Sequence, residues 1–205
     1  MTTRLGDALI RLHTDLRALN ARWALVGGLA VSARVEPRVT KDLDAAIAVR
    51  WDREAESLVA DLVAQGYLLD SEHILEHQVT GRLATVRVVA PVPKSEGVEV
   101  DLLFATAGIE PEVVGHAKPY EVLPGLVVPL ASIGHLIALK LLASRPQDWT
   151  NAQQLLEVAS DADLAVARKA LDLITDRGYG RDKDLRRSFA ALQAHAPWPP
   201  DDPQP

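Results

Sequence analysis

The chain has 205 residues, a formal net charge of −6 and a hydrophobic content of 48%, which suits one compact unit or one domain with a helical annex. It contains no cysteine, which excludes disulfides, thiol nucleophiles and cysteine-based zinc sites and fits a reducing compartment. No apolar run reaches the ~20 residues that span a bilayer, and the N-terminus lacks the pattern of a signal peptide. We therefore expect a cytoplasmic protein with no membrane partner. Its negative charge argues against a large, sequence-independent hold on nucleic acid.

The first part of the chain mixes helical and strand patterns. Leucines at helical spacing predict an amphipathic helix from about Leu5 to Asn20. The segments that follow predict, in chain order, a strand Trp23–Val26, a short helix Leu29–Arg34, a strand Asp42–Val49 and a helix Glu54–Gln65 ended by Gly66. Two further strands are expected at Arg82–Val89 and Val98–Phe104, and Pro119–Val128 adds another extended piece.

From Ser132 onward the pattern is helical. Ser132 is a suitable N-cap for the first of four helices, which carry apolar stripes and cover Ile133–Ser144, Thr150–Ala159, Asp163–Asp176 and Lys183–His195. The last ten residues, 196–205, hold five prolines and two adjacent aspartates and are predicted to be a disordered tail. The fold class is therefore α/β (α+β), with a mixed sheet flanked by helices and followed by a C-terminal helical region.

One stretch carries the strongest chemical pattern. Gly27 and Gly28 stand at a strand-to-helix turn, and Asp42 and Asp44 occupy alternate positions of the next apolar run. Alternation puts both carboxylates on one face of a strand, where they repel each other unless a cation lies between them. The free N–H groups of the helix that follows Gly28 can receive a phosphate. The combination predicts a divalent metal beside a phosphate, as nucleotide chemistry requires.

Each half of this pattern also has a simpler interpretation. A Gly-Gly pair is commonly only a tight turn, and an Asp-x-Asp is commonly a solvated strand edge. Leu43 and the apolar run from Ala45 to Val49, however, make the strand apolar enough to be buried. A buried strand does not carry two carboxylates without a reason.

These residues resemble a known family. Gly27-Gly28, a spacer, and then Arg38-x-Thr40-x-Asp42-Leu43-Asp44 are similar to the motif of the DNA polymerase β-like nucleotidyltransferase superfamily, most of all to its AbiEii-like branch, the toxins of type IV toxin–antitoxin systems. That family carries a third acidic residue on a later strand, which Asp101 matches. Lys140 and the following Arg145-Pro-Gln-Asp148 resemble a helix and an Arg-x-x-Asp segment that the family places after its sheet.

The chain also departs from the family pattern. Many members have Gly-Ser in place of Gly27-Gly28, so a hydroxyl contact to phosphate is lost unless Ser32 supplies it. Asn151 stands where the toxin branch has a second aspartate, and Pro146 interrupts the helical pattern.

The resemblance implies a role for each residue. Asp42, Asp44 and Asp101 would be catalytic and would hold Mg²⁺ or Mn²⁺, with Glu99 as the rival of Asp101 on the same strand face. Lys140 would neutralise the leaving pyrophosphate; its alternative is a lysine stem lying along an apolar helix. The nucleotide-binding residues would be Gly27, Gly28, Ser32, Arg38 and Thr40.

The implied function is transfer of a nucleoside monophosphate from a nucleoside triphosphate (NTP) to an acceptor hydroxyl, with release of pyrophosphate. We expect a nucleotidyltransferase catalytic domain over residues 1–130, the helical region over 131–195 and the tail over 196–205. The toxin branch implies tRNA as acceptor and a cognate antitoxin protein as partner. The alternatives are an aminoglycoside-like antibiotic as acceptor, or a non-catalytic nucleotide-binding partner module.

Overall fold

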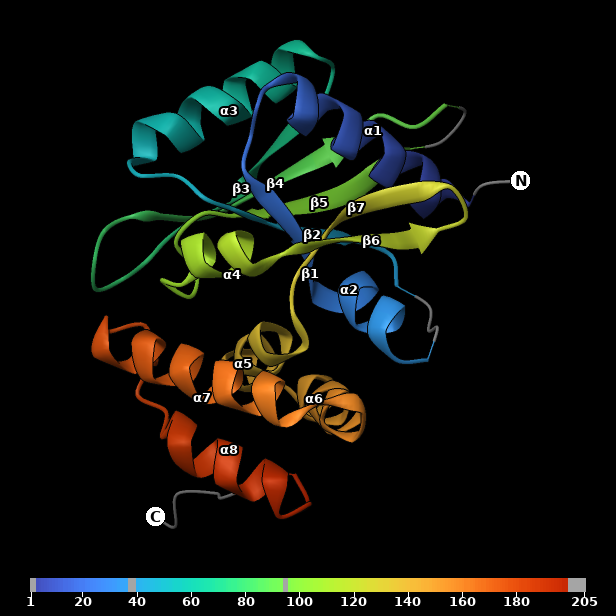
Figure 1. Cartoon of the computed structure of the whole chain (residues 1–205). Coiled ribbons are helices and arrows are strands. Elements are labelled where there is room, and N and C mark those ends of the chain that lie inside the picture. The colour runs from blue at the N-terminus through green and yellow to red at the C-terminus, as the bar shows by residue number, and fades with distance from the viewer. Residues whose placement is uncertain (1–2, 37–39, 94–95, 199–205) are drawn as a thin grey trace.

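A computed structural model describes residues 3–36, 40–93 and 96–198. Its centre is a mixed seven-stranded sheet with the strand order β3-β4-β5-β2-β1-β7-β6 (Figure 1). The strands are β1 Trp23–Val26, β2 Leu43–Ile47, β3 Leu68–Glu76, β4 Leu83–Ala90, β5 Val98–Leu103, β6 Lys118–Leu123 and β7 Leu126–Leu130. The helices are α1 Arg4–Ala18, α2 Gly27–Arg34, α3 Asp52–Ala64, α4 Glu110–His116, α5 Ile133–Ala143, α6 Pro146–Val158, α7 Asp161–Asp176 and α8 Leu185–Gln193.

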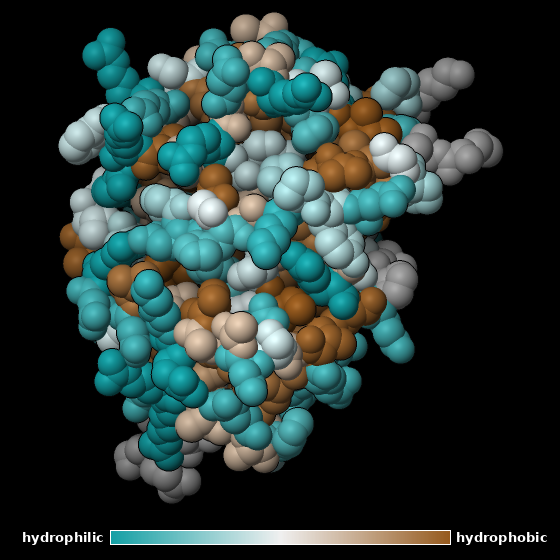
Figure 2. Space-filling view, viewed as in Figure 1, coloured by the Kyte–Doolittle hydropathy of each residue, from teal (hydrophilic) through white to brown (hydrophobic). Residues whose placement is uncertain are grey.

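Helices cover both faces of the sheet. Helices α1 and α3 pack over β3, β4 and β5, whereas α2 and α4 contact β1 and β2, and α5 to α8 form a separate layer below them (Figure 1). The predicted leucine stripe of α1 explains its position, since Leu9, Leu12 and Leu16 are fully buried against the sheet. The apolar residues on the face seen in Figure 2 gather in separate patches between polar side chains.

The two central strands meet helices on both sides. All four residues of β1 are buried, and in β2 only Asp44 is not fully buried. Strand β1 pairs antiparallel with β2, and β2 pairs parallel with β5. This pairing places Val26, Asp44 and Asp101 in one row across the sheet. The predicted fold class is thereby confirmed, and the row positions the candidate site.

Two elements of the fold, β3 and α4, lack a predictive sequence pattern, and two others, β6 and β7, share one predicted segment. The edge strand β3 could not be predicted from the sequence, because it is exposed along nearly its whole length and therefore lacks an apolar alternation. Helix α4 could not be predicted either, because it has only seven residues, among them Pro111 and Gly115. The single extended piece predicted over Pro119–Val128 is a hairpin of β6 and β7.

The C-terminal helices begin and end close to their predicted positions. Helix α6 starts at Pro146, earlier than predicted, because proline is accepted in the first turn of a helix and Asp148 completes a capping box with Arg145. The first residues of the predicted tail contact α6. The indole N–H of Trp149 donates to the carbonyl of Ala196 at 3.2 Å. The rings of Trp149 and Trp198 form a tilted pair with their centroids 6.0 Å apart. Residues 199–205 lie outside the described residues.

None of the helices in the described ranges combines the length and the apolar character that crossing a bilayer requires.

Candidate functional site

The site is centred on Asp44, at the second position of β2. Asp44 is the direct neighbour of Val26 on β1 and of Asp101 on β5. The pKa of the Asp44 carboxyl is raised to about 6. Burial is the largest cause, and the negative charges of Asp42 and Asp101 add to it, while Lys140 and the backbone N–H of Gly28 oppose the shift. Asp44 is thus a carboxylate that is held among like charges and is short of positive charge.

Gly27 is fitted to this carboxylate. The residue has φ +67°, and a Cβ atom added to it would overlap the carboxyl group of Asp44. Helix α2 begins at Gly27, so its first N–H groups lie beside the carboxylate. The Gly27-Gly28 pair is therefore required by the close approach of a functional side chain as well as by the turn itself.

We expect Gly27→Ala to abolish binding of nucleotide with Mg²⁺, because the methyl group would displace the Asp44 carboxylate. Gly81→Ala is a matched control, since Gly81 has nearly the same φ, +66°, but open space around it. Titration calorimetry with ATP and thermal denaturation would check both variants. If the two variants lose the same stability and both retain binding, the contact of Gly27 with Asp44 does not shape the site.

The third carboxylate of the row, Asp101, is paired with an arginine. The Arg87 guanidinium donates to both carboxylate oxygens of Asp101, at 2.7 and 2.9 Å, and also contacts Glu99 at 3.1 Å. Asp101 lies opposite Asp44, whereas the Glu99 side chain is 57% exposed and lies at the position paired with Val89. The geometry favours Asp101 over Glu99 as the third acidic residue. No sequence pattern pointed to Arg87.

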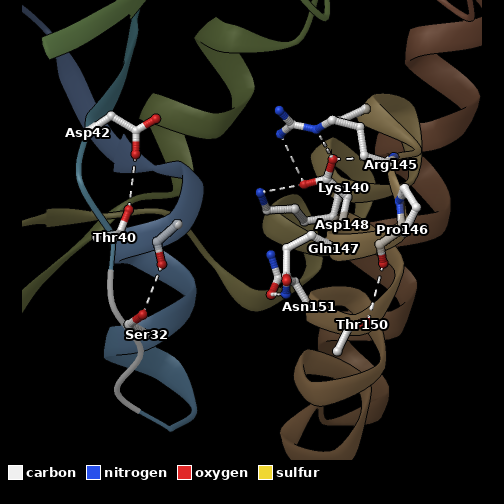
Figure 3. Close-up of polar contacts among 12 residues, drawn as sticks. Ser32, Thr40, Asp42, Lys140, Arg145, Pro146, Gln147, Asp148, Thr150 and Asn151 are labelled. Atoms are coloured by element: carbon white, nitrogen blue, oxygen red, sulfur yellow. Dashed lines mark hydrogen bonds and ion pairs between the residues drawn. The ribbon is translucent and has the colours of Figure 1, made fainter.

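The other predicted nucleotide-binding residues are only partly brought together. Strand β2 begins at Leu43, so the predicted strand start at Asp42 is one residue early. The Asp42 carboxylate accepts a hydrogen bond from the Thr40 hydroxyl at 3.0 Å. The Ser32 hydroxyl donates at 3.1 Å to the carbonyl of Gly28 within α2 and is turned toward its own helix (Figure 3). Arg38 lies outside the described residues.

Lys140 lies on α5 and forms a cluster with Arg145 and Asp148. Its ammonium group contacts Asp148 at 2.8 Å, and Arg145 contacts the other oxygen of Asp148 at 2.6 Å (Figure 3). Lys140 and Asp148 are only 8% and 1% exposed. The first partner of Lys140 is therefore Asp148, although its charge still lowers the pKa of Asp44.

Arg145 is the accessible cation of this cluster. Asp148 raises the pKa of Arg145 most, and the negative charges of Asp44 and Asp42 raise it as well. The Arg145 side chain is 73% exposed, so it can contact a ligand without leaving Asp148. The sequence resemblance includes Arg145, but it gives the cation role to Lys140.

The oxygen donors present are of the type that Mg²⁺ and Mn²⁺ prefer. In the ranges that the structure describes, however, no group of three metal-ligating side chains is already gathered for an ion. Asp42 is engaged by Thr40 and Asp101 by Arg87, which leaves the Asp44 carboxylate without a side-chain donor among the interactions of the described residues. Asp42 and Asp44 thus fit a divalent ion, and Asp101 would join it only on release from Arg87.

We expect Asp44→Asn to stabilise the metal-free protein at pH 8. Between about pH 4 and pH 6 the folded protein holds the Asp44 proton that the unfolded chain has released, so the free energy of unfolding falls as pH rises. Removing the charge should recover on the order of 2 kcal/mol at pH 8 and little at pH 4. Denaturant unfolding in EDTA would measure this, with the exposed Glu157→Gln as control. If the variant were less stable than wild type at pH 8, the charge of Asp44 would not destabilise the folded protein, which would contradict the prediction.

Known proteins support the assignment of the fold. The chain is similar to an antigenic nucleotidyltransferase-like protein from Paracoccidioides brasiliensis, with a TM-score of 0.51 and 16% identity over 95% of this chain and 93% of that one. It is also similar to the antibiotic-resistance factor ANT(2'')-Ia, with a TM-score of 0.50 and 15% identity over 92% and 94% of the two chains. No curated protein sequence matches the chain.

A family model described as the nucleotidyl transferase AbiEii toxin of type IV toxin–antitoxin systems matches residues 11–200. The match includes the Gly27 turn, the carboxylates of β2 and β5, and the Lys140 cluster. The chain therefore belongs to the AbiEii family of nucleotidyl transferase toxins.

Proposed function

We propose that this protein is a metal-dependent transferase that moves a nucleoside monophosphate from an NTP to an acceptor hydroxyl. The observation that carries the proposal is the Asp44 carboxylate, which lies against the Gly27 turn, next to Asp101, without sufficient positive charge to balance it. Divalent ions that bind with the triphosphate would supply the missing positive charge, and the start of α2 would receive phosphate oxygens.

Asp42 and Asp44 would hold the divalent ions. When bound, such ions neutralise a triphosphate and stabilise the entering and leaving oxygens of an in-line displacement. A free N–H group in the first turn of α2 would contact a phosphate oxygen, and the exposed Arg145 would pair with the leaving pyrophosphate. Lys140 would act through Asp148, by holding that carboxylate and hence Arg145 in place.

Asp101 would accept the proton of the acceptor hydroxyl. The acceptor oxygen then forms a bond to the α-phosphorus, the bond to the bridging oxygen of the β-phosphate breaks, and pyrophosphate leaves. Arg87 fixes the orientation of the Asp101 carboxylate before reaction, because it donates a hydrogen bond to each carboxylate oxygen. Proton acceptance requires that this pairing loosens as the hydroxyl approaches.

Substitution of Asp42 or Asp44 should have a different effect from substitution of Asp101. Asp42→Asn or Asp44→Asn should lose NTP affinity and transfer together, because both residues hold the charge that travels with the triphosphate. Asp101→Asn should retain most Mg²⁺-dependent NTP binding while transfer falls by a factor on the order of 10² or more. Calorimetry and single-turnover transfer with labelled NTP would separate the two effects.

Glu99→Gln is the control for Asp101, since it removes the other partner of Arg87. If Glu99→Gln abolished transfer while Asp101→Asn left it near wild type, the third carboxylate would be Glu99. Equal NTP affinity in Mg²⁺ and in EDTA would contradict the proposal that Asp42 and Asp44 hold divalent ions.

We propose tRNA as the acceptor, and an antitoxin as the cognate partner, on the basis of the family to which the chain belongs. A cationic small molecule is the second candidate, because the chain carries a net charge of −6 and one protein of similar fold is an antibiotic-resistance factor. Labelled NTP offered with total tRNA and with aminoglycosides should label RNA, and the labelling should weaken steeply with salt. Label on the aminoglycoside alone would select the second candidate.

A further inference from the structure

A groove of about 660 Å³ lies at the end of β2, on the side of the sheet where α1 and α3 pack. The link from α1 to β1 forms one wall, and the first turns of α3 form the other (Figure 1). Ile47, the last residue of β2, lines the groove, about 10 Å along the strand from Asp44. The two residues are three apart and so face opposite sides of the sheet. The groove is therefore separate from the candidate site.

The side chain of Trp51 is exposed in this groove. Trp51 is 70% exposed, whereas Trp23 and Trp149 are only 5% and 3% exposed. The backbone before Trp51 is held in place, because the Arg82 guanidinium donates to the carbonyl of Arg50 at 3.4 Å, and α3 begins directly after Trp51. The groove thus presents an indole on a fixed backbone, with a flat apolar face open to a ligand.

Three exposed arginines line the same groove, Arg22, Arg50 and Arg53. Within the described part of the chain, none of their guanidinium groups has an ion-pair or hydrogen-bond partner. Two acids, Glu54 and Asp61, also line the groove, and the Glu54 carboxylate already accepts a hydrogen bond from the backbone N–H of Arg50 at 2.9 Å. The arginines are therefore available to an anionic ligand.

A second hollow continues the groove along the end of α1. It shares Asn20, Ala21 and Arg22 with the groove and adds the exposed Arg17, and no acidic side chain of the described residues lines it. The two hollows together hold four arginines and two acids, although the whole chain has a net charge of −6. Positive charge is thus concentrated locally around the exposed indole.

We propose that this groove, the Trp51 groove, binds an unpaired segment of RNA, with a base stacked on the indole and the neighbouring phosphates paired with Arg22, Arg50 and Arg53. Proteins hold single-stranded nucleic acid in basic grooves where bases stack on aromatic side chains. The inference rests on the proposed function and deepens it, since the groove anchors the acceptor RNA outside the candidate site. A macromolecular acceptor reaches both places, whereas an aminoglycoside bound at the candidate site does not.

An acidic protein segment is the other polyanion that would pair with these arginines. Such a segment would leave the face of the Trp51 indole without an aromatic partner. An RNA strand covers that face with a base and brings phosphates to the arginines on either side of the indole at the same time. The combination of an exposed indole with unpaired guanidinium groups therefore favours RNA.

Substitution of Trp51 tests the stacking. Anisotropy of a labelled single-stranded RNA of about ten nucleotides measures its binding to the full chain. Trp51→Leu should weaken this binding by about tenfold, the contribution of one stacked base, whereas Trp51→Phe keeps an aromatic ring and should retain most of the affinity. A blunt RNA duplex has no unpaired base, so wild type and Trp51→Leu should bind it equally.

Substitution of the arginines tests the phosphate contacts. Arg22→Gln, Arg50→Gln and Arg53→Gln should each lower the slope of log affinity against log salt concentration by about 0.7, the value for one phosphate of a single strand. Arg4→Gln is the matched control. It removes the same charge from an exposed arginine at the opposite end of α1, and Arg4 does not line the groove.

The outcomes separate this inference from the proposed function. Mg²⁺-dependent NTP binding should be unchanged in all these variants, because the groove is remote from Asp44. Wild-type RNA affinity in folded Trp51→Leu, or salt slopes equal to that of Arg4→Gln, would overturn the Trp51 groove and leave the proposed function standing. Tighter binding of polyglutamate than of RNA at the same salt concentration would assign the groove to an acidic protein segment instead. Absence of Mg²⁺-dependent NTP binding in wild type would overturn the proposed function itself.

Circular dichroism would check that each variant is folded. If Trp51→Leu failed to fold, the arginine variants and the comparison of single-stranded with duplex RNA on wild type would still decide. Equal affinity of wild type for the single strand and the duplex would contradict stacking on Trp51.

Discussion

The contact between the Gly27 turn and the Asp44 carboxylate constrains the rest of the site. It requires a residue without a side chain at position 27, a left-handed backbone there, and the register of β1 against β2 that puts Val26 opposite Asp44. A shift of that register by one residue would turn Asp44 to the other face of the sheet. The strand pairing, the start of α2 and the carboxylate row are therefore one geometric unit.

The charges around this unit are distributed unevenly. Arg87 is bound to Asp101 and Glu99, and Lys140 and Arg145 are bound to Asp148, so each cation already has an acidic partner. Asp44 receives only their longer-range field. Pairing the Asp44 carboxylate with a cation would stabilise the folded protein. Active sites commonly retain such an unpaired charge at a cost in stability.

The sequence predicted those parts of the site that lie within one local pattern. Gly27 with Asp44 could be identified because a glycine turn and an apolar strand with spaced acids are both readable along the chain. Arg87 could not, because its role depends on the register of β4 with β5, which no local pattern encodes. Lys140 was placed on the correct helix, but its partner Asp148 follows a turn that the helical pattern does not determine.

The edge strand β3 has a consequence for solubility. Leu68, Leu69, Ile74 and Leu75 are all more than 40% exposed on a strand whose outer edge has no neighbour in the described sheet. Such an edge invites strand addition by another chain and hence aggregation. Pairing with β4 shifts between Asp70 and Ile74, and acidic side chains interrupt the apolar ones. The shifted pairing and the acidic side chains thus make β3 a poor template for intermolecular β-sheet growth.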